Sequence, residues 1–117
     1  MQAKEQPVSK FIDLRDHQIK QLVEKLRPSV EIRKDLDIGY SFDGKDLILF
    51  EIRPKWNDRR VLIELPFAKG WYIKSKGIWK IYWKRANGWY PYDPHEVSNV
   101  KKFFDMVVED KHGCFFG

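Results

Sequence analysis

The feature that most constrains the fold is a series of short alternating segments, each followed by a tight-turn sequence. From Leu36 to Phe42, every second residue is large and apolar, which is the pattern of a strand with one buried face. Asp43-Gly44 follows directly and favours a hairpin turn, because both residues tolerate a positive φ. This combination predicts antiparallel strands joined by short connections.

The pattern continues as far as residue 92. Apolar or alternating segments recur at short intervals, and Pro, Gly or Asn residues separate them. The expected strands after Asp43-Gly44 are a return strand at 47–53, a third strand at 61–65 ending at Pro66, a fourth at 69–74, a fifth at 78–85, and a short sixth at Trp89-Tyr90 following the Asn87-Gly88 turn. The simplest topology is a five- or six-stranded antiparallel meander from 36 to 92.

Helical periodicity brackets this meander. Residues 9–27 carry apolar side chains at helical spacing, with Ser9 as the expected cap and Pro28 as the stop. A second apolar stripe predicts a helix at 98–110, which Ser98 would cap and Gly113 would close. The predicted fold class is therefore α+β: an antiparallel meander flanked by an N-terminal and a C-terminal helix.

The domain organisation follows from length. The chain has 117 residues, which suits one domain. Residues 1–8 are expected to be a flexible arm, and residues 9–117 a single α+β domain whose tail, Cys114-Phe115-Phe116, packs on the sheet. Cys114 is the only cysteine, so no internal disulfide forms, and a reducing, cytoplasmic location is expected. No apolar run reaches the ~20 residues of a membrane-spanning helix, so no membrane partner is expected.

Charge and aromatic residues are concentrated together. Residues 67–92 hold six basic side chains and nine aromatic ones, and no carboxylate. Single-stranded nucleic-acid binders combine cations that neutralise phosphates with flat rings that stack on bases. The best functional hypothesis is therefore a small non-enzymatic binding module, whose partner is DNA or RNA.

Strand alternation predicts which side chains form that surface. If the turn near Gly77 pairs the fourth and fifth strands in register, one face carries Tyr72, Lys74, Lys80, Tyr82 and Lys84. The other side would point into the core with Trp71, Ile73, Trp79, Ile81 and Trp83. The lysines would then contact phosphates and the tyrosines would stack on bases. The expected flanking residues are Arg53, Lys55 and Trp56.

Other interpretations stay open. Lysine and tyrosine are also ordinary residues for the wet face of an antiparallel sheet. Exposed aromatics or a free sheet edge would suit a protein-interaction or homo-oligomerisation domain. Asp37 followed by Glu51-Ile52-Arg53 resembles the carboxylate pattern of metal-dependent nucleases, although Arg cannot accept a proton as their lysine can. The sequence predicts no catalytic residue, metal site or cofactor, because His and Cys are too few and scattered.

Several segments together resemble a known family. The first three are Leu36-Asp37-Ile38-Gly39-Tyr40, Phe50-Glu51-Ile52-Arg53-Pro54-Lys55-Trp56 and Trp79-Lys80-Ile81-Tyr82-Trp83-Lys84-Arg85-Ala86, and the fourth is the closing Gly113-Cys114-Phe115-Phe116-Gly117. Over roughly residues 22–117 the chain resembles a family of small bacterial proteins defined as domain of unknown function 3024. The resemblance implies a stand-alone bacterial domain, and implies no activity, cofactor or ligand. It draws attention to Glu51, Arg53 and Trp56, which belong to the shared pattern.

Overall fold

The computed structural model describes the backbone of residues 6–116 and the side chains of residues 14–116. The elements in chain order are α1 (Gln6–Leu26), β1 (Asp37–Phe42), β2 (Asp46–Lys55), β3 (Asp58–Ile73), β4 (Ile78–Arg85), β5 (Gly88–Val97) and α2 (Val100–Glu109). The strands form one sheet in the order β1-β2-β3-β4-β5, and every neighbouring pair is antiparallel. The α+β meander predicted from sequence is confirmed, with five strands.

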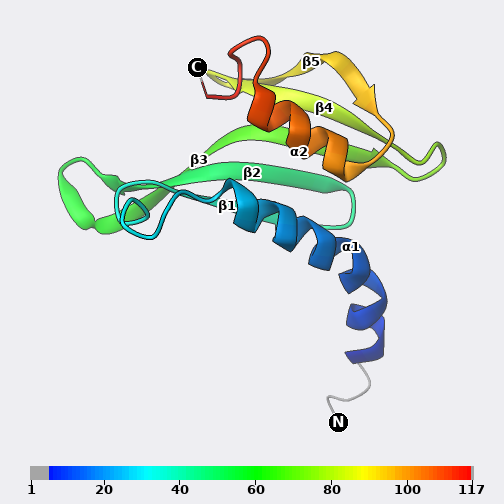
Figure 1. Cartoon of the computed structure of the whole chain (residues 1–117), viewed down its shortest axis with the longest axis horizontal. Helices are drawn as coiled ribbons and strands as arrows, with labels where there is room; N and C mark the ends of the chain where they lie inside the picture. Colours follow the sequence, from blue (N-terminus) through cyan, green and yellow to red (C-terminus); the bar gives the residue numbers. More distant parts are fainter. Residues whose placement is uncertain (1–5, 117) are drawn as a thin grey trace.

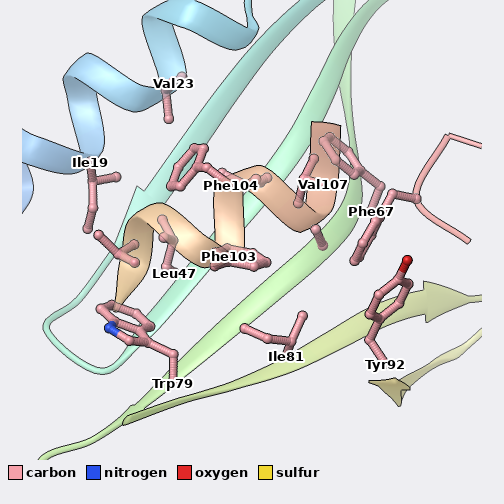
Figure 2. Close-up of a cluster of buried hydrophobic side chains, with 14 of the residues drawn as sticks. Ile19, Val23, Leu47, Phe67, Trp79, Ile81, Tyr92, Phe103, Phe104 and Val107 are labelled. Carbon is pink, nitrogen blue, oxygen red and sulfur yellow. The ribbon is translucent and has the colours of Figure 1, made fainter. Parts of the chain in front are cut away.

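Both helices lie against the same face of the sheet (Figure 1). One hydrophobic cluster joins them to it. Ile19 and Val23 of α1 and Phe103 and Val107 of α2 are at most 3% exposed. Figure 2 shows these side chains with Leu47, Trp79 and Ile81, which reach them from the strands. The opposite face has no helix over it in the described part of the chain, and is called the open face below.

The third and fourth strands expected from sequence are one strand. β3 runs through Pro66 without a turn, and a β-bulge between its pairing with Leu49 and with Phe50 accommodates the change of register. Proline lacks a backbone N–H, so within a sheet it is tolerated at bulges and edges. Pro66 meets both conditions, because β3 pairs with β4 only from Ala68 onward. Reading Pro66 as a strand end was therefore wrong.

Several boundaries also moved. β2 continues through Pro54 to Lys55, and the short sixth strand predicted at Trp89-Tyr90 is the start of the ten-residue β5. A cis peptide bond joins Asp93 and Pro94 within this strand. The tail behaves as expected, because Phe115 is buried and stacks on Tyr92 with ring centroids 4.4 Å apart.

The helix caps differ from those predicted. α2 is capped by Asn99, whose side chain accepts a hydrogen bond from the backbone N–H of Lys102, and not by Ser98. Its C-cap is Asp110, in the left-handed conformation, while Gly113 also has a positive φ three residues later. Ser and Asn have similar preferences for the N-cap position, so sequence alone did not decide between Ser98 and Asn99.

The N-terminal helix begins earlier than expected. α1 starts at Gln6, three residues before the predicted cap Ser9, and ends at Leu26 just before Pro28. Of the expected flexible arm at 1–8, residues 1–5 lie outside the described residues. No helix in the described residues is both long and apolar enough to span a bilayer.

Candidate nucleic-acid interface

The face predicted for β4 is confirmed. Trp79 and Ile81 are buried beneath the helices, at 4% and 0% exposure. Because side chains alternate along a strand, Lys80, Tyr82 and Lys84 project from the open face. These three side chains are half-buried among their neighbours.

The face predicted for the preceding strand is wrong. Tyr72 pairs with Trp79 and packs on its ring at 5.1 Å, so it lies on the helix-covered face. Trp71, expected in the core, pairs with Lys80 and is 39% exposed on the open face. Tyr72 therefore cannot stack on a ligand beside Tyr82.

The physical reason is the length of one turn. Placing Tyr72 beside Lys80 requires a three-residue turn between β3 and β4. The last pair is instead Ile73 with Ile78, which leaves four residues in the turn. The backbone N–H groups of Lys76 and Gly77 both donate to the Ile73 carbonyl, and Gly77 has φ +64°. A register shift of one residue moves every side chain of a strand to the other face.

The resulting surface alternates lysines with aromatic rings. Its members come from β3, β4 and β5 and are called the lysine–aromatic face: Lys69, Trp71, Lys80, Tyr82, Lys84 and Trp89. In the ladder each lysine is paired with a ring, Lys69 with Tyr82, Lys80 with Trp71 and Lys84 with Trp89. Each ammonium group thus lies beside a flat apolar surface.

The distances bear out this arrangement. The Nζ of Lys69 lies 5.5 Å from the ring centroid of Tyr82 and 5.9 Å from that of Trp89. The Nζ of Lys84 lies 5.5 Å from Trp89, and the Nζ of Lys80 lies 6.0 Å from Trp71. Cations within about 6 Å of a ring are attracted to it. Each of the three lysines therefore lies over a ring, and none of them takes part in an ion pair with a carboxylate among the described residues.

Two carboxylates border the lysine–aromatic face. Asp46 pairs with Trp71 and Glu96 pairs with Lys80, so both project on the open side. Asp46 and Glu96 both lie outside residues 67–92 in the sequence, and the pairing of the strands brings them beside the lysine–aromatic face. Burial raises the pKa of the Tyr82 hydroxyl, and the nearby negative charge of Asp46 raises it further. The Tyr82 ring also packs edge-to-face with the ring of His95, at 5.0 Å between centroids.

Lys74 lies apart from Lys80 and Lys84. It belongs to the β3–β4 turn and lines a cleft of about 680 Å³ together with Arg15, Lys45 and Tyr72, and Trp71 is the one member of the lysine–aromatic face that also lines this cleft. Arg15 donates to the Gly44 carbonyl at 3.3 Å, and its guanidinium lies 4.9 Å from the Tyr72 ring centroid. Lys74 therefore joins a cluster at one end of the sheet, and is not a member of the lysine–aromatic face.

Arg53, Lys55 and Trp56 lie at the other end of the molecule. They occupy the turn end of the β2–β3 hairpin, which is the left-hand loop in Figure 1. Arg53 pairs with Ile63 and its Nε donates to Glu51 at 2.9 Å. Trp56 is 91% exposed at the turn. The structure does not bring these three residues beside Lys80 and Tyr82, because β4 has no pairing with β3 before Ala68.

The carboxylates of the nuclease alternative are each paired with an arginine. Both oxygens of Asp37 accept hydrogen bonds from Arg27 at 2.9 Å, and these bonds hold the pKa of the Asp37 carboxyl below its usual range. Glu51 accepts from Arg53. Among the described residues no group of three or more His, Cys, Asp and Glu side chains is arranged to hold a metal ion. Cys114 is partly buried, and its thiol is 3.8 Å from the His112 carbonyl.

Sequence reasoning missed three members of the lysine–aromatic face: Lys69, Trp71 and Trp89. A four-residue turn at 74–77 would have placed Lys69 and Trp71 on the face of Lys80. Trp89 would have followed from pairing the strands around Ala86 and Asn87, which sets Lys84 opposite it. The sequence therefore contained the information needed to place these three residues, but using it required the correct lengths of the β3–β4 and β4–β5 turns.

These features define a class: a small α+β domain in which two helices cover one face of an antiparallel meander and leave a lysine–aromatic surface on the other. Residues 8–117 match DUF3024, a domain of unknown function, and the chain belongs to this family. No curated protein and no solved structure matches the chain.

Proposed function

We propose that this protein is a non-enzymatic module that binds single-stranded nucleic acid on its lysine–aromatic face. The observation that carries the proposal is the pairing of every lysine of that face with an aromatic ring across the β3–β4 and β4–β5 ladders. A nucleotide presents the same alternation, an anionic phosphate beside a flat base. Lys69, Lys80 and Lys84 would neutralise phosphates, while Trp71, Tyr82 and Trp89 would stack on bases.

The size of the surface suits a short single strand. Neighbouring strands are ~4.8 Å apart and residues rise ~3.4 Å along a strand, so three strands and five positions give roughly 10 by 14 Å. Sheet surfaces of this kind stack two or three bases of a single strand. In a duplex the bases are stacked on one another, so the rings of this face could not stack on them without unstacking the duplex. Single strands are therefore the expected partner.

The overall charge is consistent with this partner. The chain carries a net charge of +5, and an acidic ligand would be attracted to it. The single cysteine suits a reducing compartment such as the cytoplasm as the place of action. The module needs no cofactor in this proposal, since affinity comes from phosphate contacts and stacking.

The test compares two tryptophans with the same substitution. Trp71→Leu removes a stacking ring from the lysine–aromatic face, whereas Trp56→Leu removes the most exposed tryptophan from the distant hairpin turn. Affinity is measured by anisotropy of a labelled oligothymidylate of about 12 nucleotides. Loss of one stacked base costs roughly 1–3 kcal/mol, so Trp71→Leu should weaken binding about fivefold or more and Trp56→Leu should leave it unchanged.

Two results would contradict the proposal. The first is no binding by the unmodified protein at 100 μM, about the weak limit of non-specific nucleic-acid binding. The second is equal weakening by both substitutions, which would place the contact elsewhere. A thermal melt of each variant shows that the fold is retained.

A further inference from the structure

The β2–β3 hairpin extends beyond the rest of the sheet. Pairing of β1 with β2 ends at Ile52, and pairing of β4 with β3 begins at Ala68. Residues 53–66 form this extension and are called the arm; Figure 1 shows its turn at the left edge of the molecule. Within the described residues, the edge of β3 that faces away from β2 has no strand beside it from Asp58 to Phe67.

The free edge is apolar. Val61, Leu62, Ile63 and Leu65 are 44%, 63%, 37% and 42% exposed, and all eight residues from Arg59 to Pro66 are exposed. Edge strands are usually short, charged or covered, because their unpaired N–H and C=O groups recruit other strands. Here a run of four large apolar residues is interrupted only by Glu64. Such an edge is typical of a surface that is covered in the working form of a protein.

We propose that this edge pairs with the same edge of a second copy of the chain, antiparallel about a two-fold axis at Ile63. Ile63 then lies opposite Ile63 of the second copy, and Val61 lies opposite Leu65. Leu62 lies opposite Glu64, so no two like charges face each other. The six side chains at positions 61, 63 and 65 of both copies form one continuous apolar row.

A second copy fits this edge better than an unrelated strand for two reasons. When two identical segments pair antiparallel, the free backbone N–H and C=O groups of both edges find partners. No free arm edge then remains to recruit a third chain, so the assembly stops at two chains. The segment is also bounded, since Pro66 has no N–H to donate and Arg59 and Arg60 place charge at its other end. The two arginines are held there by ion pairs with Asp35 and Asp58.

The expected association is weak. A standard interface buries ~800 Å² per partner from 20–30 residues, so an arm of about 14 residues buries on the order of 400 Å² per copy. Interfaces below ~1,200 Å² in total belong to weak, transient complexes, so the association is expected to require a high protein concentration. The arm lies outside the lysine–aromatic face, so this proposal stands or falls independently of nucleic-acid binding.

The register can be tested by cross-linking in a Cys114→Ser background. Residues directly opposite in an antiparallel pair have Cα atoms ~4.5–5.5 Å apart, within the 4.4–6.8 Å that a disulfide spans. Ile63→Cys should therefore form a covalent dimer when oxidised by glutathione disulfide. Leu62→Cys is the matched control. Residue 62 lies opposite residue 64 of the second copy, so the two cysteines at position 62 are diagonal neighbours ~7–8 Å apart and should cross-link little. Equal cross-linking at both positions, or none at either, would overturn the proposal.

The association itself is measured by sedimentation equilibrium from 1 to about 200 μM, a range set by the weak interface expected. The average mass should rise above the 14.1 kDa of one chain as concentration increases. Ile63→Lys sets two ammonium groups opposite each other and should hold the mass at one chain. Val108→Lys changes an exposed valine on α2, outside the arm, and should have no effect. A constant mass for the unmodified protein, or equal effects of both substitutions, would contradict the pairing.

Discussion

The salt dependence of oligonucleotide binding gives the most quantitative test of the lysine–aromatic face. Each lysine that neutralises a phosphate releases counterions from the strand, so log Kobs falls with log salt by about 0.7 per contact on single strands. With Lys69, Lys80 and Lys84 in contact, the slope should be about −2.1. Affinity should then fall about 18-fold between 50 and 200 mM salt.

Substituting two lysines changes this slope in a defined way. The double variant Lys80→Gln and Lys84→Gln leaves Lys69, so its slope should be about −0.7 and its loss over the same range about threefold. If the lines meet near 1 M salt, where counterion release contributes nothing, the variant binds about tenfold more weakly at 200 mM. Glutamine removes the charge without introducing repulsion toward Glu96, which pairs with Lys80.

The matched control changes two lysines on the other side of the molecule. Lys102 and Lys111 are exposed on α2 and just after it, and Lys102→Gln with Lys111→Gln lowers the net charge by the same amount. Anisotropy titrations at four salt concentrations supply the slopes. If the two double variants have the same slope, binding follows net charge and not a defined surface, and the reasoning from the sheet register is refuted.

Two further predictions concern the fold that positions this surface. Gly70→Val should lower the free energy of unfolding, measured in urea, by about 1–3 kcal/mol. A Cβ built at Gly70 lies 3.2 Å from both Phe103 and Trp79, so the two methyl groups of valine would overpack the core. A loss under ~0.5 kcal/mol would show that α2 can move aside. Asp37→Asn should destabilise the protein at pH 7, and the difference in unfolding free energy from wild type should shrink as the pH falls below about 4. The pKa of Asp37 is lower in the folded protein than in the unfolded chain, so its carboxylate stabilises the fold above the unfolded-state pKa. This stabilisation is lost when the carboxylate is protonated. Urea unfolding of both proteins at pH 7, 4 and 3 measures this, and a difference independent of pH would assign the effect to packing.

Local sequence patterns predicted the positions of the helices and strands better than the turns and the strand pairing that connect them. The alternation from Leu36 to Phe42 and the stripe of Val100, Phe103, Phe104 and Val107 each report burial directly, and both elements formed where expected. Pro66 misled because its meaning depends on whether a neighbouring strand needs its N–H. The presence of a neighbouring strand is decided by the tertiary structure, and no local sequence pattern reports it.

The candidate site shows the same limit more sharply. The lysine and aromatic content of residues 67–92 was visible in the sequence, and Lys80, Tyr82 and Lys84 were placed on the correct face. Their neighbours were not, since the turn at 74–77 has four residues where three were assumed. A turn length is selected by the energy of the whole hairpin, including the packing of Tyr72 on Trp79. Arg15 of α1 also lies over the Tyr72 ring, and Phe42 of β1 packs on Trp79, so residues far away in sequence contribute to that energy.

The two proposed surfaces have a geometric relation that follows from the sheet. A two-fold axis that relates antiparallel edge strands stands perpendicular to the sheet, so it keeps the same face of both copies on the same side. Pairing at Ile63 would therefore join two five-stranded sheets into one, with both pairs of helices behind it and both lysine–aromatic faces in front. A strand long enough to cross the two arms would contact both faces, and the second contact would be intramolecular. Weak association of the arms and weak binding by each face would then reinforce each other, because the strand that bridges two copies also holds their edges together.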